Sequence, residues 1–234
     1  MAPAGPARPA RPAPCMRPDP ARRCNFGRPV AHWEAMSPIS FKRTRERDPR
    51  LPPGQYDTGD SFPVLTAEVS PKIAAQDWSL RIDGLVADPQ VWTWDAIRAL
   101  PGSTYQGDIH CVTTWSKLGT WFGGVSVDTL LDTVSVLPSA THVVAWSSTG
   151  YTTNLPLEHL TGGKAWVVWQ HEGKPLPPQH GGPARLLVPH LYFWKSAKWL
   201  GGLRLLDHDE PGFWETRGYH ELGDPWLEQR YDGD

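Results

Sequence analysis

Hydrophobic and polar residues alternate along several short stretches of this chain. Residues 78–84 (WSLRIDG) alternate as a strand with one buried face does. Short hydrophobic runs at 142–146, 165–169, 184–189 and 202–207 predict further strands. Strands therefore dominate the pattern.

Two short helices interrupt this strand pattern. Thr93 is a suitable N-cap for a helix over 93–102, and Ser126 for another over 126–134. One or two helical turns are expected in LPLEHL, directly after Asn154. No strand is followed by a GxGxxG turn and a full helix, which excludes a doubly wound sheet. Short helices among many strands predict an α+β fold with mixed β-sheets.

Composition divides the chain into three parts. Residues 1–36 are rich in proline and arginine, with seven prolines in the first 20 positions, and this composition predicts a disordered tail. Residues 37–75 contain further prolines and predict an extended entry segment that wraps the domain. Residues 76–234 carry the strand and helix patterns and form the predicted folded domain, against which the last 25 residues are expected to pack.

Charge is distributed unevenly along the chain. The net charge is −2, yet residues 1–50 hold eleven basic and four acidic side chains, which leaves 12 basic and 21 acidic ones in the rest. An acidic folded part argues against a nucleic-acid partner. No hydrophobic run approaches the roughly 18 residues that span a membrane, so no membrane span is predicted.

The cysteines and the start of the chain bear on the cellular compartment. Cys15 and Cys24 lie in the proline-rich tail, and a disulfide framework is therefore not predicted. Arg22 and Arg23 are not followed by the hydrophobic segment of a twin-arginine export signal. Both observations favour a reducing, cytoplasmic location.

Cys111 is the one cysteine of the predicted folded domain, within DIHCVTTWSKLGTWFGG. A buried structural thiol would need no partners. A nucleophile would need a base and an oxyanion hole, yet the adjacent His110 points to the opposite face of an extended segment and no GxSxG turn occurs. A zinc site would need further Cys or His ligands at short spacing. A metal whose other ligands come from a cofactor needs a single protein thiolate, and a solitary cysteine fits that case.

A second segment, residues 175–203, gathers cationic side chains around a predicted strand. They are His180, Arg185, Lys195 and Lys198, and glycine pairs on either side allow the backbone to approach a ligand closely. Arginine and lysine both suit phosphate groups. Flanking aromatic residues, in a chain with 13 tryptophans, favour a buried anionic cofactor over a solvated basic face.

These two segments together resemble the sulfite oxidase superfamily, whose members carry an oxidoreductase molybdopterin-binding domain. The similarity covers about residues 60–230, from WSLRIDGLVADPQVWTWDAIRALP through HCVTTWS to EGKPLPPQHGGPARLLVPHLYFWKSAKWL. The last stretch is the most specific, because it follows the family's order of His or Asn, Gly, Pro, Arg and then Lys-Ser-x-Lys. The resemblance implies a sulfite-oxidase-type molybdopterin-binding fold and a molybdenum cofactor.

The resemblance also implies roles for individual residues. Cys111 would be the thiolate ligand of molybdenum, whose other ligands would be the pterin dithiolene and oxo groups. The cofactor-binding residues that it implies are Ser147, His180, Arg185, Lys195, Ser196, Ala197 and Lys198. Further pocket candidates, on sequence position, are Thr66, His110, Trp115 and Tyr151.

The residues after Cys111 depart from the sulfite oxidase pattern. Val-Thr-Thr-Trp-Ser stands where sulfite oxidases have Ala-Gly-Asn-Arg-Arg, so their arginine-rich sulfite pocket is not implied. The loop is more similar to the bacterial branch that includes the catalytic subunit of protein-methionine-sulfoxide reductase. Thr113 stands where that branch has a carboxylate.

The function implied by this resemblance is that of a molybdopterin-dependent oxidoreductase. It would transfer an oxygen atom to or from a small sulfur- or nitrogen-containing substrate, as a sulfite oxidase-like enzyme or an S- or N-oxide reductase. Such chemistry also implies an electron-transfer partner, which the sequence does not identify. The alternatives are a metal-free binding module on the same fold and a cysteine enzyme that pairs Cys111 with a histidine.

Overall fold

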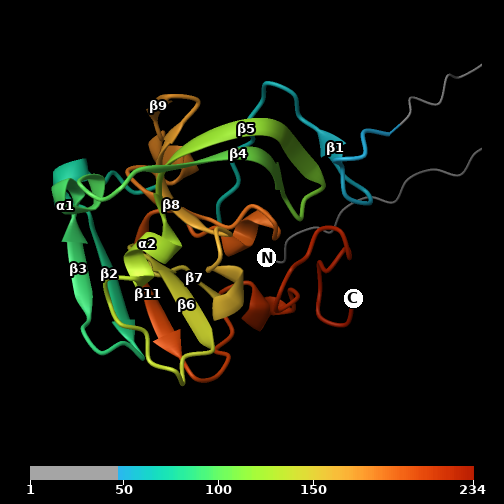
Figure 1. The fold of residues 1–234 in the computed structure, drawn as a ribbon. Helices are drawn as coiled ribbons and strands as arrows, with labels where there is room; N and C mark the ends of the chain where they lie inside the picture. The colour runs from blue at the N-terminus through green and yellow to red at the C-terminus, as the bar shows by residue number, and fades with distance from the viewer. Residues whose placement is uncertain (1–46) are drawn as a thin grey trace, which may run out of the picture. The chain divides into compact units, whose positions relative to one another are not determined.

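Residues 47–234 are described by a computed structural model, in which short helices and loops connect two β-sheets (Figure 1). The predicted tail over 1–36 and the first part of the predicted entry segment lie outside the described residues. The strands are β1 (Tyr56–Asp57), β2 (Ser79–Gly84), β3 (Gln90–Thr93), β4 (Ser103–His110), β5 (Trp115–Ser126), β6 (His142–Ser147), β7 (Thr152–Pro156), β8 (Trp166–His171), β9 (Lys174–Pro175), β10 (Arg185–Leu187) and β11 (Leu200–Leu206). The helices are α1 (Trp94–Arg98), α2 (Val127–Leu131) and the 3-10 helices η1 (Ala75–Asp77), η2 (Leu157–His159), η3 (Pro178–His180), η4 (Phe193–Lys195) and η5 (Glu215–Arg217).

Both sheets contain parallel and antiparallel strand pairs. The first has the order β1-β5-β8-β10, with β4 paired to β5 and β9 to β8, and the second has the order β3-β2-β11-β6-β7. β1 runs parallel to β5, and β11 runs parallel to β2. The other strand pairs of the two sheets are antiparallel. These mixed sheets with few, short helices confirm the predicted fold class.

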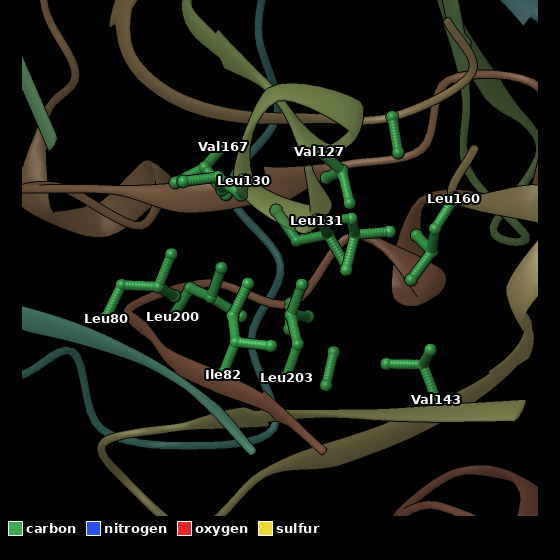
Figure 2. Close-up of a cluster of buried hydrophobic side chains, with 14 of the residues drawn as sticks. Leu80, Ile82, Val127, Leu130, Leu131, Val143, Leu160, Val167, Leu200 and Leu203 are labelled. Atoms are coloured by element: carbon green, nitrogen blue, oxygen red, sulfur yellow. The ribbon is translucent and has the colours of Figure 1, made fainter. Parts of the chain in front are cut away.

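The main hydrophobic core lies between the two sheets and around α2. Val127, Leu130 and Leu131 on α2 face side chains of the second sheet (Figure 2). Leu80 and Ile82 on β2 are fully buried, as the alternation in this strand predicts. α2 follows β5 of the first sheet directly, and the chain then enters β6 of the second. This helix therefore connects the sheets and fills the space between them. Within residues 47–234, no helix is both long and hydrophobic enough to cross a membrane.

The helix caps follow the sequence, but the expectation for the segment after Asn154 was wrong in part. The side chains of Thr93 and Ser126 cap α1 and α2, as predicted. The residues after Asn154 form strand as far as Pro156, and only the short η2 follows. Pairing of β7 with β6 in the sheet overrides the local helix signal.

The longest strand pair was not predicted, and it presents Cys111. β4 and β5 form an antiparallel hairpin, and residues 111–114 connect them. Glycines interrupt the alternation of both strands, which hides them in the sequence. Close packing requires glycine at position 124, because a Cβ atom there would lie 2.0 Å from Val167 O on β8.

Candidate active site

A cavity of about 300 Å³ opens beside the connection between β4 and β5. This volume lies in the range of small-molecule binding sites, and most of the wall is aromatic or aliphatic. The predicted site residues on its wall are Cys111, His180, Arg185, Ser196 and Lys198. The fold therefore brings together the two segments that the sequence singled out.

The remaining predicted residues divide between the wall and the interior. Thr66, Trp115 and Tyr151 also line the cavity. Ser147, Lys195 and Ala197 are buried but do not line it, and His110 opens onto a different surface, described below.

Cys111 is held in place by the backbone around it. Its N–H donates to Trp115 O at 2.8 Å, and its carbonyl accepts from Thr114 N at 3.0 Å. Thr114 has a φ of 75°, which is strained for a β-branched residue. Tyr56 N on β1 donates to Thr114 O at 3.0 Å and so secures this conformation. The neighbouring strand thus fixes the turn that aims the sulfur into the cavity.

The thiol of Cys111 is buried and has one hydroxyl neighbour. Its Sγ lies 3.2 Å from Thr113 Oγ1, and the residue is 8% exposed. Burial raises the pKa of the Cys111 thiol, while Thr113 and the charges of Arg230 and Lys198 oppose this rise. In the described part of the chain, no histidine forms a hydrogen bond with Sγ. A nucleophile activated by a histidine therefore finds no support in this geometry.

Arg185 is a buried cation without a carboxylate partner. Its guanidinium donates to the carbonyls of His180 at 2.9 Å, Leu186 at 3.2 Å and Ser196 at 2.6 Å. It also lies 4.0 Å from the ring centroid of Phe193. No ion pair to Arg185 occurs among residues 47–234. Burial lowers its pKa to about 9, which shows how poorly the charge is compensated.

Lys198 adds a second cation to the same wall. Its Nζ donates to Leu65 O and Gln179 O, both at 2.7 Å. Burial, and then the charge of Arg185, lower the pKa of Lys198 to about 7. An anionic ligand in the cavity would stabilise both cations, and phosphate is the anion that such a pair suits.

Two further groups on the wall favour a polar ligand. Trp115 Nε1 is buried and has no hydrogen-bond partner within the described residues, so an acceptor on a ligand would satisfy it. The ring of His180 stacks on Phe62, with centroids 3.9 Å apart and planes at 10°. Burial, and then the charge of Arg185, lower the pKa of His180 to about 4, so its ring is neutral at pH 7. The thiol, the uncompensated cations and the orphan N–H together fit a metal held by a phosphorylated organic cofactor.

Lys195 lies in a buried ion pair and not on the cavity wall. Its Nζ is 2.6 Å from Glu215 Oε1, and both side chains are fully buried. The same Nζ donates to Asn154 O at 2.8 Å and to its Oδ1 at 3.2 Å. Lys195 therefore joins η4 to β7 and η5 rather than reaching into the cavity.

The sequence did not show that the C-terminal segment touches the cysteine turn. Arg230 Nη1 donates to Val112 O at 2.5 Å, and its guanidinium lies 5.1 Å from the ring centroid of Tyr192. The aromatic and charged composition of the last 25 residues predicted packing against the domain, but it carried no information on where.

Comparisons with known proteins identify the family of this chain. A family model described as the oxidoreductase molybdopterin binding domain matches residues 67–214. The uncharacterized oxidoreductase YuiH of Bacillus subtilis is 42% identical over 197 residues, which cover 83% of this chain and 99% of YuiH. The catalytic subunit MsrP of the protein-methionine-sulfoxide reductase of Gluconobacter oxydans is 30% identical over 169 residues, which cover 62% of this chain and 52% of MsrP.

A solved structure shows the same fold. The sulfane dehydrogenase SoxCD of Paracoccus pantotrophus aligns with a TM-score of 0.56 at 23% identity, over 60% of this chain and 41% of that one. The family model spans both Cys111 and the cationic segment that faces it. The chain therefore belongs to the oxidoreductase molybdopterin-binding domain family of the sulfite oxidase superfamily, and the protein is an oxidoreductase.

Proposed function

We propose that this protein reduces organic S-oxides with a molybdenum cofactor, and that Cys111 is the protein ligand of the metal. The cofactor, when bound, supplies oxygen-atom transfer between metal and substrate with the matching two-electron change. The observation that carries the proposal is the placement of the Cys111 thiol on a mainly aromatic cavity wall that also bears two uncompensated cations.

The cationic wall would hold the phosphorylated end of the cofactor. Arg185 is rigid because its three carbonyl contacts fix the guanidinium, and Lys198 adds a point charge beside it. The Ser196 hydroxyl accepts from Val188 N at 2.9 Å, which leaves its own O–H free to donate to the cofactor. Trp115 Nε1 offers a further donor.

The wall of the cavity suits a neutral substrate with apolar groups. Phe193, Trp194, Trp214 and Tyr219 contribute rings to it, and such rings exclude water and pack against alkyl groups. A sulfite dianion would instead need free cationic donors close to the sulfur ligand, whereas Lys198 and Arg230, whose charges act on the Cys111 thiol, already donate to backbone carbonyls. The residues directly after Cys111 are Val112, Thr113 and Thr114, none of which is cationic.

The names of two relatives support the same substrate class. MsrP of Gluconobacter oxydans is named as the catalytic subunit of a protein-methionine-sulfoxide reductase. A 28% identical protein of Azospira oryzae is named as a putative subunit of such a reductase. The chain spans 52% and 58% of these two relatives, so this substrate is a proposal for the present protein. The cytoplasmic location and the boundary at residue 76 likewise stay predictions.

The test compares the two directions of oxygen transfer in one preparation. The protein is purified from a host that makes molybdopterin and is assayed with reduced methyl viologen and methionine sulfoxide, and separately with sulfite and ferricyanide. We expect viologen-driven sulfoxide reduction that the Cys111→Ser variant lacks. Sulfite oxidation without any sulfoxide reduction would refute the proposed direction and substrate.

A further inference from the structure

A second cavity, of about 750 Å³, opens on the surface next to the hairpin that carries Cys111. Tyr105, Trp166 and Trp226 contribute aromatic rings to its wall, and His110 lies among them. None of these four residues lines the cavity of Cys111. Because neighbouring residues of an extended strand point to opposite faces, the ring of His110 and the sulfur of Cys111 face different cavities across one peptide unit.

A chain of hydrogen bonds places the ring proton of His110 on Nδ1. Gln55 Nε2 donates to Cys111 O at 3.0 Å, so Gln55 Oε1 is the acceptor for the Ser116 hydroxyl, at 3.3 Å. Ser116 Oγ has then used its proton, and it accepts from His110 Nδ1 at 2.8 Å. His110 Nε2 therefore carries a lone pair. It has no hydrogen-bond partner in the part of the chain that the structure describes, although His110 is only 5% exposed.

The cations that line this second cavity are exposed side chains at its edge. Arg50 lies 3.8 Å from Asp108 and 2.9 Å from Asp48. The Nζ atom of Lys164 donates to Glu158 O at 3.0 Å. In contrast to the cavity of Cys111, no buried arginine or lysine lines this one within residues 47–234. The wall thus suits a neutral, planar ligand that donates a hydrogen bond to His110.

We propose that the second cavity binds a quinol, which stacks on the aromatic wall and donates a hydroxyl hydrogen bond to His110 Nε2. The quinol is the reductant for the oxygen-atom transfer at Cys111, so this inference rests on the proposed function. Rings such as Trp226 provide stacking surface, and Trp226 is 51% exposed without a ligand. A quinol matches the wall in charge, planarity and hydrogen bonding.

The reaction balances without a further reagent. The quinol loses two electrons and two protons and becomes the quinone, and both protons leave to water through the open mouth of the cavity. The sulfoxide takes up two electrons and two protons and becomes the sulfide and water. Electrons would pass between the cavities across the peptide unit that joins His110 to Cys111, whose Cα atoms are about 3.8 Å apart. The hydrogen bonds through Ser116 and Gln55 provide a second connection, to Cys111 O.

Binding is tested directly with durohydroquinone, a planar quinol whose hydroxyl can donate to His110 Nε2, under anaerobic conditions and with the cofactor already reduced. Calorimetric titration of the cofactor-loaded full chain should give one site. His110→Phe removes the acceptor, and Trp226→Ala removes the stacking surface at an exposed position where folding is not at risk. We expect at least tenfold weaker binding in both variants. His208→Phe is the matched control, because His208 is exposed and lines neither cavity.

Three results would overturn the inference. They are unchanged affinity in both His110→Phe and Trp226→Ala, absence of durohydroquinone binding to the wild-type protein, and loss of binding in Cys111→Ser. The last would place the quinol in the cavity of Cys111. If durohydroquinone does not bind and the protein takes its electrons from a redox protein instead, this face is a protein-docking surface and the inference is wrong.

Turnover separates this inference from the proposed function. Sulfoxide reduction is driven with durohydroquinone or with reduced methyl viologen, which needs no dedicated site. The ratio of the two rates should fall at least tenfold in Trp226→Ala and stay constant in His208→Phe, and a constant ratio in Trp226→Ala would contradict the inference. If the wild-type protein reduces no S-oxide with viologen, the proposed function fails, while calorimetry still decides whether the second cavity binds a quinol.

Discussion

Replacement of Lys195 by methionine tests whether this residue stabilises the fold or binds the cofactor. The sequence resemblance implies a cofactor contact, whereas the structure places its Nζ 2.6 Å from Glu215 Oε1 in a fully buried pair. Burial lowers the pKa of Lys195, and the charge of Glu215 opposes this shift. If Lys195 stabilises the fold, its replacement lowers the free energy of unfolding. If it binds the cofactor, its replacement lowers the molybdenum content.

The size of the stability loss depends on the hydrogen bonds that Glu215 would keep after the substitution. After Lys195→Met, its Oε1 still accepts from Trp194 Nε1 at 2.9 Å and from Thr153 Oγ1 at 3.1 Å. Its Oε2 has no partner among the described residues. A carboxylate buried with two neutral donors remains uncompensated, and breaking a buried pair in this way costs about 3–5 kcal/mol.

The assay is guanidinium unfolding of the cofactor-free protein at pH 7. Lys195→Met should lower the free energy of unfolding by about 3–5 kcal/mol with an unchanged dependence on denaturant. The double variant Lys195→Met/Glu215→Leu should recover most of this loss, because hydrophobic replacement of both partners is often neutral. Lys174→Met is the matched control at an exposed position and should change stability by less than about 0.5 kcal/mol.

The opposite outcome would refute this reasoning. If Lys195→Met unfolds at the same denaturant concentration as the wild type but loses its molybdenum, then Lys195 acts on the cofactor. The structural interpretation of the ion pair would then be wrong.

Three further predictions concern the cavity wall, a strand end and a histidine pair. Arg185→Gln should lower molybdenum content at least tenfold by mass spectrometry, and unchanged content would exclude a role in cofactor binding. Gly84→Ala should lower the free energy of unfolding by about 2–3 kcal/mol, because the residue has a φ of 84° and a Cβ there would lie 2.2 Å from Leu205 O. Burial, and then the charge of His159, lower the pKa of His190 to about 4. The unfolded chain therefore takes up this proton first, and stability is lost as pH falls from about 6.5 to 4. His190→Gln should remove about 1–2 kcal/mol of that loss after allowance for solvent screening, and an unchanged pH profile in denaturant titrations would contradict this.

The sequence predicts those parts of the fold whose signals are local. The N-caps Thr93 and Ser126 were predicted because a side-chain oxygen that accepts from the backbone N–H three residues later is a local feature. Alternation identified β2 for the same reason. The β4–β5 hairpin was missed because glycines such as Gly124 interrupt its alternation. Gly124 is required by close packing against a strand that is distant in the sequence, and no local pattern shows this.

The candidate site likewise has residues that the sequence predicts and contacts that it does not. Cys111, His180, Arg185, Ser196 and Lys198 were singled out in sequence, and the structure brings all of them to one wall. The ion pair of Lys195 could not be predicted, since its partner lies 20 positions further along the chain. The chain position of His110 gave no sign of a second cavity, because that cavity is assembled from separate segments.

The central claim is that Cys111 binds molybdenum in the first cavity, and metal content tests it most directly. Molybdenum per chain is measured by plasma mass spectrometry on wild-type protein and on Cys111→Ser, each purified from a host that makes molybdopterin. X-ray absorption at the molybdenum edge on the same samples counts the sulfur neighbours. We expect about one molybdenum per wild-type chain, and one sulfur neighbour fewer in whatever metal Cys111→Ser retains. Wild-type protein without molybdenum, or an unchanged sulfur count in the variant, would contradict the account.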